Sequence, residues 1–566
     1  MVECPVCSAE LLEMSMEQAE EHVNGCLDRS VLEEKKRIKK TSIKIISKQE
    51  PTMEIRGAKA VLEEIEQTEP DTEEIPQYDI PLEKASPQAS YMSKHPLPSY
   101  KRMPHTTFTV DAFKYGKLDF CTGYFLTHFH SDHYGGLSRG FTGHIYCSRI
   151  TANCVQYRIG VDPQFIHALP MNRRCNVQGV FVTFIDANHC PGAVIIVFEI
   201  PQANGGMARI VHTGDFRASP DHVKQILQIL AVEHNQPVRP AMVLNKLNSY
   251  GSPPIDYLYL DTTYLQPTYA FPSQSQVVQA VAEFCFKVNS DKTYLPNLQT
   301  KSKQQKKPMQ LTNWFKITSK APTRTSKRRV LFVVGSYTIG KERLFIEIAQ
   351  RLGARIYVAA AKRRMLECLG SRSLLQMLSD SMSAQVHVVE MSRVNMRGLT
   401  EYLEMAQKHA PFSSIVAFRP TGWSHAPGAL YRQQPRGPDP PGPAVLQQLL
   451  AQNNQDPAQL IQHLAQISLL QSDSQFTIDS LKPRGASASV TIFPVPYSEH
   501  SSFAELGRFV CSLNTKHVVP TVSCDAANAR WLQHWQNVNA LFAQAAKSTQ
   551  PELFSNAWIA FISNAK

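Results

Sequence analysis

Short runs of apolar and β-branched residues recur at regular intervals from about residue 105 onwards. In the first part of this region, turns and short amphipathic stretches join the runs, which favours a layered α/β sandwich. The predicted strands are Gly143–Ser148, Phe181–Ala187, Ala193–Ile200, Arg209–Gly214 and Tyr257–Leu260.

A second rhythm begins near Thr263, where predicted helices alternate with predicted strands. This alternation indicates a parallel sheet with helices on its faces. Its elements are helices Gln274–Val288 and Lys341–Leu352 and strands Val330–Val334, Arg355–Ala359, Val386–Glu390 and Ser414–Phe418. A strand at Ser489–Pro496 and a helix at Ser501–Leu513 follow, and beyond Asp525 we expect an amphipathic tail without chemical motifs.

Three polar segments interrupt these patterns. Residues 30–103 are rich in Glu, Lys, Pro, Gln and Ser with few aromatics, so we expect a disordered linker. Residues 289–328 are polar and basic, and residues 426–484 run from a Pro/Gly-rich start into a Gln-rich stretch. We expect both to be insertions that are at least partly disordered.

The composition is sufficient for a real hydrophobic core, since 43% of the residues are hydrophobic. Its 566 residues suggest roughly three or four domain-sized units. No uninterrupted apolar run of about 18 residues occurs, so we expect no transmembrane helix. The amino terminus does not read as a secretory signal. The net charge of +11 favours nucleic acid weakly, and the 12 scattered cysteines favour a reducing compartment.

The run His128-Phe129-His130-Ser131-Asp132-His133 carries the most chemistry. It follows an apolar strand, so His128 and His130 point the same way, and a turn then brings Asp132 and His133 toward the same cavity. Imidazole and carboxylate groups together suit zinc, and two half-sites side by side suit a two-metal centre. A chance cluster of surface histidines is the alternative.

Three later segments supply further ligands. His189 lies in a Pro-Gly turn just after a predicted strand, Asp215 follows another strand, and His500 lies between a strand and a helix. A layered α/β fold keeps its active site where strands end. This placement therefore argues against a chance cluster.

These segments resemble the metallo-β-lactamase fold with an inserted β-CASP domain, and more specifically the DNA cross-link repair nucleases to which Artemis and Apollo belong. Further marks are the runs Phe108–Gly116, Asp261–Tyr264, Gly335–Glu342 and Phe418–Trp423. The resemblance implies an αββα sandwich at 104–262 and 486–525, a β-CASP domain at 263–485, and a tail at 526–566.

The resemblance also implies roles for individual residues. His128, His130, His189 and Asp215 would hold one metal, and Asp132, His133, Asp215 and His500 the other. Asp261 falls on an acidic motif near the metals, and either Asp261 or His500 would assist the leaving oxygen. Asp132 would orient the attacking hydroxide, and Asp111 matches a supporting aspartate. Val522 stands where RNA-processing relatives have a further histidine, which favours DNA.

The Gly335–Lys341 loop follows a strand and opens a predicted helix. Backbone N–H groups, the Ser336 and Thr338 hydroxyls and Lys341 would cradle a phosphate there. A helix cap without a ligand is the alternative.

Residues 1–29 predict a structural zinc finger. Cys4 and Cys7 form a knuckle, and His22 and Cys26 share one helical face, which together make a closed Cys3His site. The finger resembles ubiquitin-binding fingers of DNA-damage proteins, in which Asp28 matches the ubiquitin-contacting aspartate. DNA binding by the finger is the alternative, and the acidic surroundings oppose it.

Two short peptides suggest partners. Leu311, Trp314 and Phe315 have the spacing of a peptide that binds the sliding clamp PCNA; the alternative is an insertion that docks these aromatics on its own domain. The basic run 33–40 reads as a nuclear import signal or a solvated helix extension.

Taken with the resemblance, these features predict a monomeric, nuclear, zinc-dependent 5′-to-3′ DNA exonuclease of interstrand cross-link repair that binds ubiquitin or ubiquitinated PCNA and no membrane. The alternatives are an RNA endonuclease of the same superfamily and a non-catalytic ubiquitin-binding scaffold.

Overall fold

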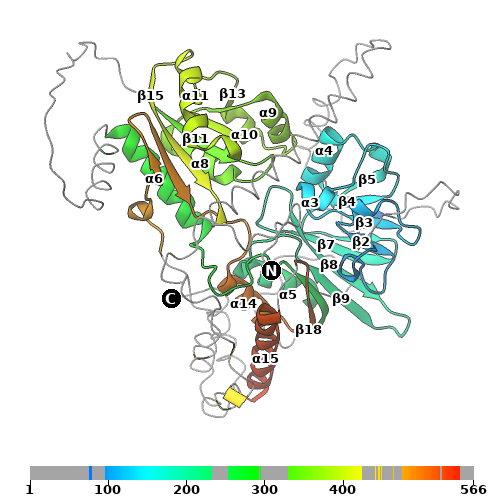
Figure 1. Ribbon diagram of the computed structural model, residues 1–566. Helices are drawn as coiled ribbons and strands as arrows, with labels where there is room; N and C mark the ends of the chain where they lie inside the picture. Colours follow the sequence, from blue (N-terminus) through cyan, green and yellow to red (C-terminus); the bar gives the residue numbers. More distant parts are fainter. Residues whose placement is uncertain are drawn as a thin grey trace, which may run out of the picture.

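The computed structural model describes residues 75–78, 96–232, 253–291, 329–422, 475–522 and 526–548, with a few isolated positions elsewhere. The predicted zinc finger, the clamp-binding peptide and most of the predicted linker lie outside these residues. The described part forms two layered units that lie side by side, as Figure 1 shows.

The first unit, here called the sandwich, packs two sheets face to face. A four-stranded parallel sheet has the order β2 (Phe108–Val110), β3 (Gly123–Phe125), β4 (Ile145–Ser148), β5 (Ile166–Leu169). The facing seven-stranded sheet has the order β1 (Gln77–Tyr78), β6 (Arg174–Val177), β7 (Val180–Asp186), β8 (Val194–Pro201), β9 (Met207–His212), β10 (Ile255–Leu260), β18 (Thr515–Pro520).

Alternating side chains explain why the seven-stranded sheet is buried on both faces. In β8, Val194, Ile196 and Phe198 lie in the core between the sheets, whereas Ile195 and Val197 belong to a second core. That second core includes residues of four helices. They are α4 (Arg149–Arg158), α5 (Pro220–Ala231), α14 (Phe503–Cys511) and α15 (Ala526–Ser548). The result is the predicted αββα arrangement.

The second unit, here called the inserted unit, is built on one seven-stranded sheet. Its strand order is β13 (Leu378–Ser379), β12 (Ile356–Val358), β14 (Val386–Glu390), β11 (Arg329–Ser336), β15 (Phe412–Pro420), β17 (Val490–Val495), β16 (Gly485–Ala486). All these pairs are parallel except β16 with β17.

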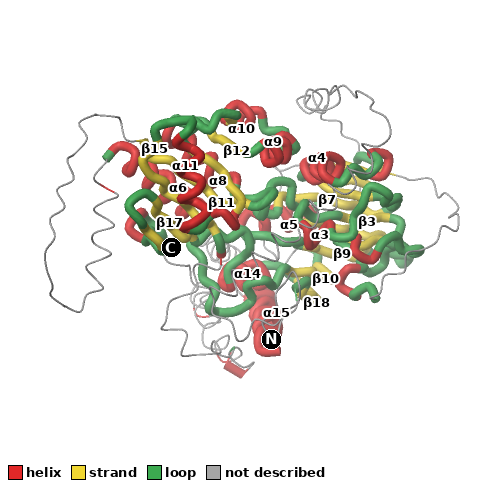
Figure 2. The backbone as a smooth tube through the Cα atoms, turned by 45° about the horizontal axis from the view of Figure 1, so that its top comes forward, coloured by secondary structure: helices red, strands yellow, loops and turns green. Residues whose placement is uncertain are grey.

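Helices cover both faces of this sheet, as the alternation of elements predicts. Phe332 and Val334 of β11 pack with α6 (Gln274–Ser290) and α8 (Glu342–Leu352), whereas Leu331 and Val333 pack with α11 (Met396–Gln407). Two shorter helices, α9 (Ala360–Glu367) and α10 (Arg372–Met377), lie near β12 and β13. Helix α9 also lies beside α4 of the sandwich (Figure 2), where Asn153 Nδ2 donates to the Cys368 carbonyl at 3.0 Å.

Two predicted boundaries are wrong, because packing between distant segments overrides the local pattern. β17 pairs with β15, so the chain at Val490–Val495 still belongs to the inserted unit and the boundary at 485 comes too early. The predicted tail begins with α15, whose Trp531 and Trp535 are buried in the sandwich core.

Two segments predicted to be disordered contribute to the described structure. In the linker, Gln77–Tyr78 forms β1 beside β6, and Met103 is fully buried. In the second insertion, Phe476 and Leu481 pack against the core of the inserted unit. Each segment is polar on average, but a few apolar residues find a partner surface supplied by other parts of the chain.

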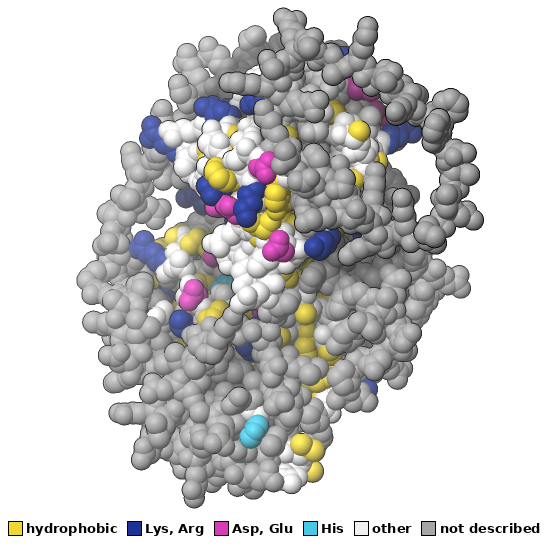
Figure 3. Space-filling view, turned by 90° about the vertical axis from the view of Figure 1, so that its left-hand side faces the viewer, with side chains coloured by type: hydrophobic (Ala, Val, Ile, Leu, Met, Phe, Trp, Pro, Cys, Tyr) yellow, Lys and Arg dark blue, Asp and Glu magenta, His cyan; other side chains and the backbone are white. Residues whose placement is uncertain are grey.

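No helix in the described ranges is long and apolar enough to cross a membrane. Figure 3 shows the charged side chains on one face of the described part of the molecule. In the described part of that face, Lys and Arg side chains are interspersed with Asp, Glu and apolar side chains.

Candidate metal centre

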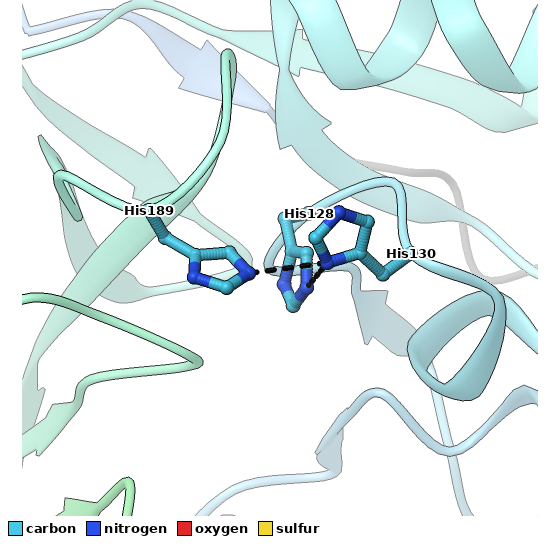
Figure 4. Close-up of side chains that lie close together, drawn as sticks. All are labelled: His128, His130 and His189. Carbon is cyan, nitrogen blue, oxygen red and sulfur yellow. Dashed lines mark hydrogen bonds between the residues drawn. The ribbon is translucent and has the colours of Figure 1, made fainter. Parts of the chain in front are cut away.

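Three histidines from two loops of the sandwich converge on one point. His128 and His130 follow β3, and His189 follows β7. The His128 Nε2 and His189 Nε2 atoms lie 3.0 and 3.1 Å from His130 Nδ1, as Figure 4 shows. Three imidazole nitrogens that face one another offer lone pairs to a shared electrophile, and this donor set fits a divalent metal ion.

A carboxylate extends this group to a second one. The Asp215 Oδ2 atom lies 3.2 Å from His133 Nε2, 3.8 Å from His128 Nε2 and 3.9 Å from His189 Nε2. Asp132 Oδ2 lies 3.5 Å from His133 Nε2. Asp215 also groups with His189 and His500. One carboxylate thus stands between two sets of ligand atoms, where it could bridge two ions.

Each histidine uses its other ring nitrogen to bind an acceptor. His133 Nδ1 donates to Asp111 Oδ2 at 2.7 Å, and His500 Nδ1 donates to Asp261 Oδ2 at 2.8 Å. His128 Nδ1 lies 3.0 Å from the Thr127 hydroxyl. Such partners fix the tautomer and the ring orientation, so that the remaining nitrogen presents its lone pair to the cluster.

Main-chain carbonyls serve the other two histidines. His189 Nδ1 donates to the Glu499 carbonyl at 2.9 Å, and His130 Nε2 lies 3.3 Å from the Ile339 carbonyl. Neither of these carbonyl partners is predicted from the sequence. Glu499 stands next to His500, which was a possible signal, but a carbonyl of Ile339 leaves no trace in the residue pattern.

The electrostatics of the cluster suit a cation. Burial, together with neighbouring histidines, holds the pKa of His128 and His189 well below its usual value, so both rings stay neutral. Burial also lowers the pKa of His133, but Asp215, Asp132 and Asp111 outweigh it and raise that pKa well above its usual value. The carboxylates therefore attract positive charge to a place where neutral imidazoles can bind it.

Asp261 does not have the exposure that its predicted role at the leaving oxygen requires. Its side chain is 1% exposed. One carboxylate oxygen accepts from the Thr263 N–H and hydroxyl, and the other accepts from His500 and the Phe216 N–H. Both Asp261 oxygens are therefore engaged by protein donors, and the carboxylate is placed to orient His500.

Lys341 is also placed differently from the prediction. Its ammonium lies 2.8 Å from Glu499 Oε2, and the two side chains are only 7% and 6% exposed. Helix α8 begins at Glu342, because Lys341 has a left-handed backbone conformation with φ 69°. The prediction that this ammonium holds a phosphate is wrong for this geometry, since a buried carboxylate already occupies it.

The two hydroxyls of the predicted cradle have separate surroundings. Ser336 Oγ donates to the Gly340 carbonyl at 2.9 Å and lies 3.1 Å from Lys362 Nζ. Lys362 also donates to the Thr338 carbonyl, whereas the Thr338 residue is exposed. The loop is thus held together by its own hydrogen bonds.

Several predicted site residues lie outside the described residues. They are the finger residues Cys4, Cys7, His22, Cys26 and Asp28 and the clamp-peptide residues Leu311, Trp314 and Phe315. Val522 is described: it is exposed, and its carbonyl accepts from the Thr262 hydroxyl beside Asp261.

Comparison with known proteins agrees with the fold and the cluster. A family model described as "DNA repair metallo-beta-lactamase" matches residues 372–526. The chain is 32% identical over 542 residues to the DNA cross-link repair protein pso2/snm1 of Schizosaccharomyces pombe, covering 94% of this chain and 78% of that protein. It is 24% identical over 428 residues to mouse 5′ exonuclease Apollo, covering 74% of this chain and 54% of Apollo.

The relatives differ in length. The DNA cross-link repair 1A protein of Gallus gallus is 33% identical over 440 residues, which are 78% of this chain but only 34% of that protein. The fission yeast match, in contrast, spans most of both chains at more than 30% identity. With the αββα sandwich and its cluster of metal-binding side chains, this similarity establishes that the chain belongs to the metallo-β-lactamase family of DNA cross-link repair proteins.

Proposed function

We propose that this chain is a zinc-dependent nuclease that degrades DNA from its 5′ end during the repair of interstrand cross-links. The observation that supports this best is the cluster of six side chains, each within reach of another, around Asp215. They are His128, His130, His133, His189, Asp215 and His500. A family of cross-link repair proteins and the name 5′ exonuclease Apollo support DNA and the 5′ end as the substrate.

Zinc is the metal that this donor set favours. Imidazole nitrogens outnumber carboxylates, and hard cations such as magnesium prefer oxygen ligands. When bound, a pair of such ions would neutralise the phosphodiester and lower the pKa of a water toward 7. The protein side chains then have to hold the ligands, orient the nucleophile and leave room for the strand.

We assign these tasks to different residues. Asp132 has a carboxylate that is 55% exposed, so it can both bind a metal and accept a hydrogen bond from the attacking water. Asp111 and Asp261 keep His133 and His500 in one orientation. His500 has its Nδ1 occupied by Asp261, so its Nε2 is the atom that would face the metal and the leaving oxygen.

The test uses purified chain with three labelled strands: 5′-phosphorylated DNA, 5′-hydroxyl DNA and RNA of the same sequence, each with and without a chelator. We expect stepwise shortening of the 5′-phosphorylated DNA from its 5′ end, loss of activity with chelator and recovery with zinc. Internal cleavage of the RNA would favour the RNA endonuclease. No cleavage of any strand would favour the non-catalytic scaffold.

The finger belongs to the same proposal as a nuclear tether to ubiquitin-marked damage. Asp28→Ala should leave the finger folded and abolish ubiquitin binding, whereas Cys4→Ala should unfold it by removing a zinc ligand. Neither change should alter cleavage of a short free strand, because a long tether raises local concentration only where ubiquitin is present. The measurement adds the full chain to isotope-labelled ubiquitin and follows the NMR spectrum of the ubiquitin. An unchanged spectrum at millimolar concentration would contradict it.

A further inference from the structure

Lys341 and Glu499 join the two units beside the metal centre. Lys341 precedes α8 in the inserted unit, and Glu499 precedes α14 in the sandwich. The Lys341 ammonium lies 2.8 Å from Glu499 Oε2, and the Lys341 N–H donates to Glu499 Oε1, also at 2.8 Å. One residue of the inserted unit therefore holds both oxygens of a buried carboxylate in the sandwich.

Glu499 passes this restraint on to the ligands. Its carbonyl accepts from His189 Nδ1 at 2.9 Å, and the next residue in the chain is His500. Holding the Glu499 side chain from two directions fixes its backbone. That backbone sets the orientation of His189 and the starting point of the His500 side chain.

The same loop reaches a third ligand directly. The Ile339 carbonyl lies 3.3 Å from His130 Nε2, and the Ile339 side chain is buried in the core of the sandwich. Gly340 has φ +107°, and a Cβ there would lie 3.1 Å from Glu499 Oε2. The loop thus approaches the centre so closely that a side chain at Gly340 would crowd the carboxylate.

Stability alone is a weak explanation for this arrangement. Replacing a buried ion pair with apolar residues is often neutral or stabilising, and a lysine in the left-handed region is strained. Such strain is typically kept where the surroundings require a fixed geometry. Here the geometry that it fixes is that of the outer nitrogens of His130 and His189.

We propose that the Lys341–Glu499 pair is a positioning device by which the inserted unit sets the metal affinity of the His128, His130 and His189 group. Neither Lys341 nor Glu499 touches a metal or substrate; both act through the histidines. This inference rests on the metal centre in the proposed function. It makes the inserted unit part of the metal site.

The experiment measures metal affinity in the full chain, by competition with a chromophoric chelator and by the absorption spectrum of the cobalt-substituted protein. Lys341→Met removes the ammonium and keeps the N–H contact. We expect the affinity of the His128, His130 and His189 group for zinc to fall about 10- to 100-fold, with a changed cobalt spectrum. Lys341→Arg, which keeps the cation, should restore most of the affinity.

Arg351→Met is the matched control. Arg351 lies on α8 and forms an ion pair with Glu283 at 2.7 Å, but both side chains of that pair are partly exposed. Loss of the Arg351–Glu283 ion pair should change the affinity for zinc by less than about twofold, as expected for a surface pair. Any contribution of the finger is common to all variants and cancels in the comparison.

Glu499→Gln tests the other partner and covers the case in which Lys341→Met fails to fold. It keeps the shape and the carbonyl that His189 binds, and it should also lower zinc affinity. The double variant should lose little more than either single one, because both changes remove the same interaction. Wild-type affinity and cobalt spectrum in a folded Lys341→Met or Glu499→Gln protein would overturn the inference. A wild-type chain that binds no metal in the sandwich would instead overturn the metal centre itself.

Discussion

Three residues beside the cluster are all aspartates, but their surroundings differ. The side chain of Asp132 is 55% exposed, whereas those of Asp111 and Asp261 are 4% and 1% exposed. The buried pair is saturated with hydrogen bonds from the protein, so each can only position a histidine. Exposure, not residue type, therefore separates the group that can meet substrate from the groups that cannot.

Asp132→Ala should abolish nuclease activity without unfolding the protein. It removes a ligand atom and the exposed acceptor for the attacking water, so we expect a loss on the order of 10²-fold or more. Asp119→Ala, on an exposed aspartate of the same unit, is the control and should keep wild-type activity. Product formation from a labelled strand and thermal melting measure the two properties. A fully active Asp132→Ala protein would contradict the assignment.

At the scale of elements, buried polar groups hold strands and helices together in both units. Arg174 of β6 lies 2.7 Å from Glu199 Oε2 of β8 and donates to the Ile229 carbonyl in α5 at 3.1 Å. Arg174 therefore ties β6 to β8 and to a helix that covers the sheet. Both side chains of the pair are almost completely buried.

Arg174→Met should destabilise the sandwich strongly, because it leaves the Glu199 charge buried without its partner. We expect a loss of about 3–5 kcal/mol in the free energy of unfolding. Arg351→Met, which breaks an exposed pair, should cost about 0–1 kcal/mol. Urea unfolding followed by circular dichroism compares the two. Equal losses would mean that burial does not decide the strength of these pairs.

A buried histidine in the inserted unit predicts a pH dependence of stability. His387 of β14 binds the Tyr402 hydroxyl and the Ala384 carbonyl. Burial is the main cause that lowers its pKa to about 4, with Arg329 and His409 adding to the effect and hydrogen bonds to backbone carbonyls opposing it. The unfolded chain, with an ordinary histidine pKa of about 6.5, takes up protons first as the pH falls. The native state is therefore favoured in full above about pH 6.5 and loses this advantage toward pH 4.

The expected loss from this one residue between pH 7 and pH 5 is about 2 kcal/mol. The measurement compares the free energy of unfolding of wild type and His387→Leu across this range. The variant should be less stable at pH 7, because it leaves the Tyr402 hydroxyl without its acceptor, but its stability should fall less steeply with pH. Parallel curves for the two proteins would contradict the low pKa of His387.

For the whole molecule, the metal centre lies where the two units meet. Its ligands come from the sandwich, and Ile339 and Lys341 reach it from the inserted unit. Arg217 adds a second tie, since it binds Glu505 of α14 and also the carbonyls of Ser498 and Pro272. A ligand bound at this junction should stabilise both units together.

Removal of metal should therefore lower the unfolding temperature of the main transition. Saturation at about 100 times the dissociation constant contributes about 2.7 kcal/mol. Differential scanning calorimetry of chelated and zinc-loaded protein measures the shift. His128→Asn, which lacks a central ligand, should show a much smaller shift of the unfolding temperature when the metal is removed. An equal shift in that variant would place the stabilising metal elsewhere.

The side chains that lie close together along the chain could be assigned to the site from the residue pattern alone. Within one strand end or tight turn, spacing alone decides which side chains point together, so His128, His130, Asp132 and His133 were found from their run. Runs of apolar and β-branched residues likewise predicted strands in all three sheets, among them β4, β8 and β11, because the side-chain period of a strand is independent of its partners.

The partners of those residues depend on how distant segments of the chain fold together. Lys341 and Glu499 are 158 positions apart, and the Ile339 carbonyl that meets His130 is 209 positions from it. The same holds for β17, β1 and α15, whose surroundings are supplied by distant segments. Whether a charge is buried, paired or free depends on which surfaces pack against it, and no local spacing encodes that. The side chains of the cluster and the supporting Asp111 were therefore predictable from the sequence, whereas Lys341, Glu499 and the Ile339 carbonyl, which act on the cluster from distant segments, were not.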